Sequence, residues 1–167
     1  MLSAPEPLDS EHEYGDFDSG EASLDDWLKR KALKNQESGA SRTFVVRDDG
    51  KVIAFYAMAS GAVATTDAPG RFRRNMPDPV PVVVLARLAI AKTHQKKGLG
   101  RALFQDAAKR VLLAVQGIGI RGLLVHALSE EAKAFYLRLG LSESPLNPMT
   151  LMVTLADLDA AHEAAGI

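Results

Sequence analysis

The residues best suited to chemistry form a short basic loop. They are Gln95, Lys96, Lys97, Gly98, Leu99, Gly100 and Arg101, in the spacing Gln-x-x-Gly-x-Gly. Glycine permits positive φ and a close approach of the backbone to a ligand. A helix that begins directly behind such a turn points free N–H groups outward, which favours an anion such as a phosphate group. A solvated basic connection is the alternative interpretation, because Gly-x-Gly alone is not specific.

An apolar run precedes this loop and a helical pattern follows it. Residues 82–90 are nearly all β-branched or aliphatic, which favours a buried strand. From Leu99 to Val115 the apolar residues recur at helical spacing and predict a helix. The loop is therefore expected at the end of a strand and at the start of a helix.

The remaining pattern predicts one mixed α/β (α+β) domain. A helix is expected from an N-cap at Ser23 to Gly39, and Asp48-Asp49-Gly50 predicts a hairpin between strands at 43–47 and 51–60. Residues 61–81, with four prolines around Arg71-Phe72-Arg73-Arg74, predict a long, partly ordered loop with a basic tip. A strand at 123–128, a helix capped by Ser129 and ended by Gly140, and a strand at 150–155 follow. Ala132, Phe135 and Leu139 are expected to face the core from that helix.

The domain itself is expected over residues 17–155. The acidic residues 1–16 have little to bury and are expected to be loosely ordered. Residues 156–167 are expected to be a tail or a short helix.

Composition limits the possible functions. The 167 residues, 47% of them apolar, suffice for a core, and the absence of cysteine excludes a disulfide, a thiolate nucleophile and a cysteine metal site. No secretory leader and no membrane span is recognisable, so a cytoplasmic protein is expected. Residues 27–110 hold seventeen basic and six acidic side chains, a net charge of +11, which suggests a polyanionic partner. Solvated faces that balance each other are the alternative.

The Gln95-x-x-Gly98-x-Gly100 loop resembles the acyl-CoA pyrophosphate loop of the Gcn5-related N-acetyltransferase (GNAT) superfamily. The segments 85–90, 124–127 and 132–141 follow in the order and spacing of that family. With Leu24-Asp25-Asp26-Trp27-Leu28, they resemble the toxin branch of type II toxin–antitoxin systems. The resemblance implies a single GNAT-type domain with a mixed, mostly antiparallel sheet, whose central strands splay apart around the pantetheine arm of acetyl-CoA.

The resemblance also implies site residues. Those expected to bind acetyl-CoA are Leu88, Ala89, Ile90, Gln95, Lys96, Lys97, Gly98, Leu99, Gly100, Arg101, Ala132 and Phe135. Tyr136 occupies the position of the general acid that protonates the departing thiolate, although a tyrosine that merely packs is the alternative. Its position one step from the apolar stripe suggests a hydroxyl exposed to a cleft.

Four arginines are candidates for substrate contact: Arg71, Arg73, Arg74 and Arg87. In the toxins that the chain resembles, the acceptor is the α-amino group of an aminoacyl-tRNA, whose phosphates favour cations. An α-amine has a reference pKa near 7.7–8.0 and requires no strong general base. Arg87 is alternatively a sheet-face salt bridge.

Two histidines could compete as acid or base, since their reference pKa lies near neutrality. His94 is interpreted as a surface or cofactor-adjacent residue. His126 is interpreted as a structural residue rather than a catalytic base. The four histidines lack metal-ligand spacing, so no metal is expected.

The resulting hypothesis is an acetyl-CoA-dependent toxin that acetylates aminoacyl-tRNA and blocks translation. Acetylation of a small amine or a protein N-terminus is one alternative, and a catalytically idle CoA-binding protein is another. The resemblance further implies a small ribbon-helix-helix antitoxin that binds operator DNA, and a homodimer of the toxin.

Overall fold

The computed structural model describes residues 1–164, which form two compact units. The first contains residues 1–59 and 86–107, and the second contains residues 60–85 and the described chain from 108 onward. Strands β3 (Lys51–Val63) and β4 (Val80–Ile90) and helix α4 (Leu99–Ala114) contribute residues to both units.

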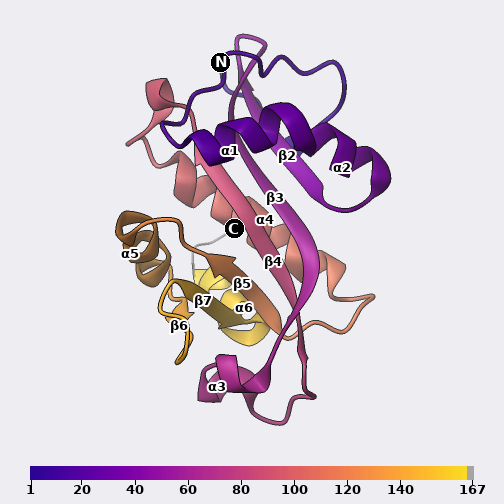
Figure 1. Cartoon of the computed structure of the whole chain (residues 1–167), viewed down its shortest axis with the longest axis vertical. Coiled ribbons are helices and arrows are strands. Elements are labelled where there is room, and N and C mark those ends of the chain that lie inside the picture. The colour runs from indigo at the N-terminus through magenta and orange to yellow at the C-terminus, as the bar shows by residue number, and fades with distance from the viewer. Residues whose placement is uncertain (165–167) are drawn as a thin grey trace. The chain divides into compact units, whose positions relative to one another are not determined.

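The first unit consists of antiparallel strands with one long helix against them (Figure 1). Besides its parts of β3, β4 and α4, it contains β1 (Glu6–Pro7), β2 (Arg42–Asp48), α1 (Ala22–Trp27), the π-helical turn η1 (Leu28–Ala32), α2 (Leu33–Ser38) and the 3-10 turn η3 (Lys92–His94). Asp49 and Gly50, with φ of 51° and 82°, join β2 to β3 and confirm the predicted hairpin. Gly39, at φ 81°, ends the helix as predicted.

The core of the first unit is aromatic. The ring of Phe55 meets Phe17 edge-on at 5.5 Å between centroids and stacks on Trp27 at 6.1 Å. Leu28 and Ala32 are fully buried on the same helix. The α1–η1–α2 helix is thus anchored along one side by apolar contacts.

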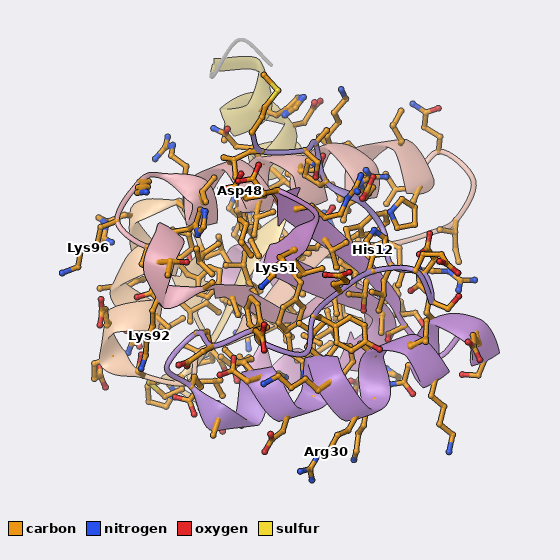
Figure 2. All side chains as sticks on the ribbon, turned by 90° about the horizontal axis from the view of Figure 1, so that it is seen from above. His12, Arg30, Asp48, Lys51, Lys92 and Lys96 are labelled. Atoms are coloured by element: carbon orange, nitrogen blue, oxygen red, sulfur yellow. The ribbon has the colours of Figure 1, made fainter. Side chains whose placement is uncertain are left out.

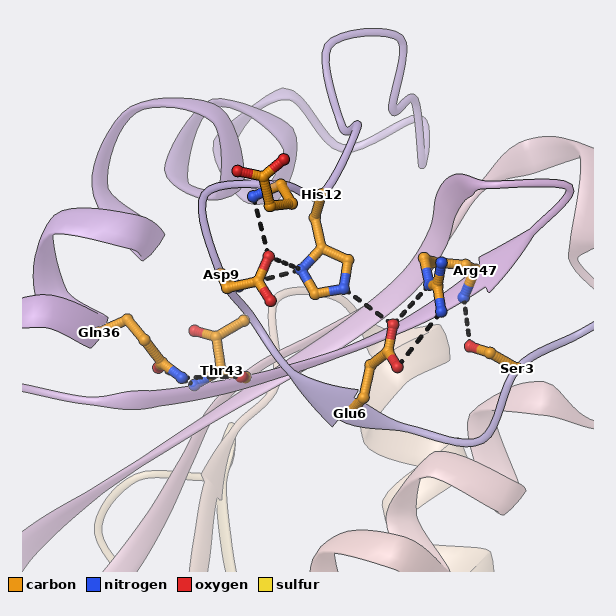
Figure 3. Close-up of polar contacts among 8 residues, drawn as sticks. Ser3, Glu6, Asp9, His12, Gln36, Thr43 and Arg47 are labelled. Carbon is orange, nitrogen blue, oxygen red and sulfur yellow. Dashed lines mark hydrogen bonds and ion pairs between the residues drawn. The ribbon is translucent and has the colours of Figure 1, made fainter.

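The acidic N-terminal segment is held against β2, although residues 1–16 were expected to be loose. Glu6 and Pro7 pair with Val45 and Phe44, and Leu8 is buried. Figure 3 shows the polar contacts: the Glu6 carboxylate lies 2.8 Å from His12 Nε2 and accepts a 3.4 Å hydrogen bond from Arg47 Nη2. The sequence pattern missed β1 because a two-residue edge strand carries no periodicity.

The second unit contains the parallel pair of strands. Its own elements are η2 (Thr65–Asp67), α3 (Gly70–Arg73), β5 (Gly122–His126), α5 (Glu130–Arg138), β6 (Ser142–Glu143), β7 (Thr150–Thr154) and α6 (Leu155–Ala164). The register of β4 with β5 runs from Val82–Gly122 to Leu85–Val125, while β5–β7 and β6–β7 are antiparallel. The strand order β1-β2-β3-β4-β5-β7-β6 defines the mostly antiparallel α+β sheet that the resemblance implied.

Residues 61–81 are more regular than the partly ordered loop predicted for them. They contain the end of β3, η2, α3 and the start of β4. Phe72 is only 2% exposed and packs in a cluster with Val63, Val80, Leu124 and Met152. Phe72, the single apolar side chain among three arginines, therefore anchors α3. The prolines of this segment had favoured a loop, so the sequence pattern did not predict this helix.

Two helix ends also bear on the predictions. The first helix has Glu21 at its N-cap, not Ser23, and Asp25 instead accepts hydrogen bonds from Ser19 N and Oγ at 3.1 and 2.6 Å. A carboxylate satisfied by the preceding turn moves the helix start upstream. The tail expected at 156–167 forms α6 up to Ala164, and residues 165–167 lie outside the described chain.

Candidate active site

The predicted phosphate-binding loop lies in the first unit, between β4 and α4. Lys96 and Gly98 adopt left-handed conformations, with φ of 63° and 81°. A Cβ at Gly98 would meet no atom within 4 Å, so glycine is required there for its φ and not for space. Gly100 lies instead in the first turn of α4 and has no positive φ. The prediction of left-handed backbone is confirmed at Gly98 and wrong at Gly100.

Helix α4 supplies the N–H groups expected of an anion site. It is sixteen residues long and begins at Leu99, and Ala102 N donates to Gly98 O at 3.2 Å. The N–H groups of its first turn have no intrahelical acceptor. Residues 95–98 and Arg101 are exposed. This set of cations and outward N–H groups fits the pyrophosphate of acetyl-CoA.

Gln95 holds the entry of the loop. Its Nε2 donates to Ser19 O and Ile90 O, both at 2.8 Å, and so ties the loop to the end of β4 and to the N-terminal segment. Gln95 was predicted as a cofactor contact, whereas its amide nitrogen is used within the chain. No sequence signal identifies Ser19 as its partner, because the two lie 76 positions apart.

A buried tyrosine anchors α4 behind the loop. Tyr56 is fully buried in β3, and its hydroxyl donates to Asp106 Oδ2 of α4 at 2.5 Å. The Phe44 ring stacks on Tyr56 at 5.2 Å. The sequence reasoning missed this pair, since a helical aspartate is ordinarily a solvated residue.

The end of β4 lies in the same unit as the loop. Leu88 and Ile90 are half-buried and Ala89 is buried. Ala91 N donates to Ile53 O at 2.8 Å and fixes the strand's exit. The structure thus groups residues 88–90 with the loop residues 95–101, as the resemblance implied.

Tyr136, Ala132 and Phe135 lie on α5 in the second unit. Ser129 caps this helix as predicted, with Oγ accepting from Ala132 N at 3.1 Å. Tyr136 is 7% exposed and meets Phe135 edge-on, whereas Ala132, Phe135 and Leu139 are half-buried. The prediction that the Tyr136 hydroxyl is exposed is therefore wrong. The prediction that Ala132, Phe135 and Leu139 form the buried face of α5 without Tyr136 is also wrong. Successive helical positions lie about 100° apart, so the stripe of Ala132, Phe135 and Leu139 defined a different face from that of Tyr136, and which face is buried depends on packing that periodicity does not show.

Burial also affects the acidity of this phenol. It raises the pKa of Tyr136 above its ordinary value near 10. A phenol of ordinary pKa is already protonated at neutral pH, so the rise does not change the protonation state there and makes the hydroxyl a weaker acid.

The four arginines predicted to contact substrate occupy different environments. Arg71 makes a bidentate pair with Asp157, with Nε–Oδ2 and Nη2–Oδ1 distances of 2.7 Å. Arg87 lies over the Trp27 ring, 4.4 Å from its centroid, and burial lowers its pKa. Arg73 lines a hollow of about 500 Å³ with Glu143 and Ser144. Arg74 lines another of about 310 Å³, with Arg71 and Arg121.

The histidines considered as acid or base have partners within the chain. His94 Nε2 lies 2.8 Å from Asp48 Oδ2 and its Nδ1 lies 2.7 Å from Thr93 Oγ1. His126 is exposed on β5, with Nδ1 3.0 Å from Thr150 Oγ1. Over residues 1–164, no group of three His, Asp or Glu side chains is placed to hold a metal ion. Within the described chain, no helix has the length and apolar character needed to cross a membrane.

The loop, α4 and the mixed sheet define an acyl-CoA-dependent transferase fold. Residues 39–142 match the acetyltransferase (GNAT) domain. This match covers more than half of the chain, and the chain therefore belongs to the GNAT family. The family and fold predicted from the sequence are confirmed.

Similar proteins are toxins. A tRNA-acetylating toxin of Mycobacterium tuberculosis is 50% identical over 158 residues, covering 95% of this chain and 95% of the relative. The structure of AtaT complexed with acetyl-methionyl-tRNAfMet has a TM-score of 0.87 and 26% identity, covering 96% of this chain and 98% of that chain. A mutant AtaT bound to the C-terminus of the antitoxin AtaR and acetyl-CoA has a TM-score of 0.81 and 25% identity, covering 96% and 97%.

Proposed function

We propose that this chain is an acetyl-CoA-dependent toxin that acetylates the α-amino group of aminoacyl-tRNA and so blocks translation. The observation that carries the proposal is the left-handed Gly98 turn at the N-terminus of α4, in a GNAT chain 50% identical to a tRNA-acetylating toxin. The cations and free N–H groups of residues 95–101 bind the pyrophosphate. Leu88, Ala89 and Ile90 hold the pantetheine arm, and Ala132 and Phe135 line its reactive end.

The chemical step needs few side chains. The neutral α-amine forms a C–N bond to the acetyl carbonyl, the C–S bond breaks, and Tyr136 protonates the departing thiolate. The amine loses its extra proton to solvent, since its reference pKa lies near neutrality. Solvent then returns a proton to the Tyr136 phenolate, which restores the phenol for the next turnover.

The partners and location follow the same proposal. A small ribbon-helix-helix antitoxin covers the site and carries the toxin to operator DNA, as the AtaT–AtaR structure supports for the antitoxin contact. The toxin acts as a homodimer in the cytoplasm, where aminoacyl-tRNA is found.

The test is to incubate the purified chain with labelled acetyl-CoA and a mixed pool of charged tRNAs. Label is expected in the aminoacyl fraction and is released as N-acetyl amino acid by mild alkali. Tyr136→Phe should lower turnover about 10²–10⁴-fold while leaving the Kd for acetyl-CoA nearly unchanged. Normal acetyl-CoA binding without label on any tRNA would contradict the proposal and favour a small amine or a protein N-terminus as acceptor.

A further inference from the structure

The α1–η1–α2 helix presents a row of cations that the proposed chemistry does not use. Between Leu28 and Lys34 the chain carries four basic side chains and no carboxylate: Lys29, Arg30, Lys31 and Lys34. All four are exposed, and within the described chain none of their side chains takes part in a hydrogen bond or an ion pair. Figure 2 shows Arg30 projecting outward from this helix. We name these four residues the helix cations.

Three other cations of the first unit pair with acidic side chains. Glu6 lies beside Arg47, Asp16 beside Lys51 at 3.4 Å, and Asp18 beside Lys92 at 3.6 Å. The partners in these pairs come from residues 6–18, which precede α1. That segment therefore screens cations on the strands and on η3 but leaves the helix cations free.

Three of the helix cations lie in the π-helical turn η1. Lys29, Arg30 and Lys31 are three consecutive exposed residues between the fully buried Leu28 and Ala32. Single π turns are uncommon and occur frequently at functional sites. Asp26 and Glu37 are the exposed acids of the same helix, and neither lies within ion-pair distance of a helix cation.

The helix is also firmly held. Trp27 stacks on Phe55 from inside the unit, and Arg87 lies over the Trp27 ring at 4.4 Å. A cationic face on a fixed helix loses little backbone freedom when it binds an extended polyanion, which lowers the cost of binding. Lysine and arginine side chains commonly contact nucleic-acid phosphates, and such contacts position the ligand without reading its sequence.

We propose that the helix cations form a contact surface for the phosphate backbone of the tRNA substrate, separate from the acetyl-CoA loop and from α3. The inference rests on the proposed function for the identity of the RNA. The surface contacts backbone phosphates and so strengthens binding of every tRNA to a similar degree, without selecting the amino acid.

The test compares equilibrium binding of uncharged tRNA to the parent and to a variant with Lys29→Gln, Arg30→Gln, Lys31→Gln and Lys34→Gln. Glutamine keeps helix propensity close to that of lysine and arginine, so the fold is expected to persist, which an unchanged acetyl-CoA Kd will verify. The Kd for tRNA should rise at least about tenfold at roughly 0.1 M salt, and the slope of log K against log salt should flatten by about three to four. The matched control Lys109→Gln removes an exposed cation of α4 and should stay within about twofold of the parent.

The double variant Arg30→Gln with Lys34→Gln provides a milder check and should flatten the slope by about two. An unchanged affinity and slope in the fourfold variant would overturn the proposal and leave the face to an acidic protein segment. Because binding needs no turnover, a parent that binds tRNA through these cations but acetylates none would contradict only the proposed function.

Discussion

The α3 region and the α1–η1–α2 helix both carry basic residues, but only in the α3 region is one of them paired with an acidic side chain. Around α3, Arg71 is held by Asp157, and Phe72 fixes the helix into a core. On the long helix, the four helix cations have no acidic partner within the described chain. A count of charges therefore does not measure the charge available to a ligand, because acids distant in sequence decide which cations stay free.

The stability of α3 is expected to depend on the buried Phe72 and not on the charge of Arg73. Phe72→Ala should lower the free energy of unfolding by about 3–5 kcal/mol, because it opens a cavity among buried side chains. Chemical denaturation followed by circular dichroism measures the change. Arg73→Ala is the matched control and should alter stability by less than about 0.5 kcal/mol. Comparable losses in both variants would show that α3 is not anchored by its phenylalanine.

A second prediction compares the two groups as tRNA contacts. Arg73→Gln with Arg74→Gln removes the two arginines of the α3 region for which the described chain shows no acidic partner. The salt slope of tRNA binding should therefore flatten by at most about two, against three to four for the fourfold helix variant. If the α3 variant flattens the slope more than the helix variant does, the helix cations are the lesser surface.

Arg87 shows what to expect of a cation that already has a partner within the chain. Arg87→Gln should cost about 0.5–1 kcal/mol of stability through the lost contact with Trp27. It should leave the salt slope of tRNA binding unchanged, since this guanidinium is already committed within the chain. Thermal unfolding and the binding titration measure the two effects separately. A flatter slope with unchanged stability would restore Arg87 as a substrate contact.

The sequence predicted those elements whose signals are local. The Asp49-Gly50 turn, the Ser129 cap and the Gly98 turn each follow from residue type and spacing, and each lies where it was expected. The pairs Gln95–Ser19, Tyr56–Asp106 and Arg71–Asp157 join residues 50 to 86 positions apart, so no periodicity reveals them. Tyr136 illustrates the limit: its place on a helix was predictable, but the side of that helix that is buried depends on the strands beneath it.

The Arg71–Asp157 pair is expected to make a small, pH-dependent contribution to thermal stability. The hydrogen bonds from Arg71 hold the pKa of Asp157 below its ordinary value near 3.9. A depressed carboxyl pKa contributes stability that is present above the unfolded value and is lost as pH falls through the folded pKa. Asp157→Asn should therefore lower Tm slightly at pH 7, and its Tm should approach that of the parent as the pH falls below about 4.

Asp159→Asn is the matched control on the same helix, since Asp159 forms no ion pair within the described chain. Its Tm should follow that of the parent across the whole pH range. A Tm difference for Asp157→Asn that persists at pH 2 would mean that the asparagine disturbs α6 itself. Equal Tm values for Asp157→Asn and the parent at pH 7 would instead show that the pair adds no stability, and the contrast between Arg71 and the helix cations would narrow.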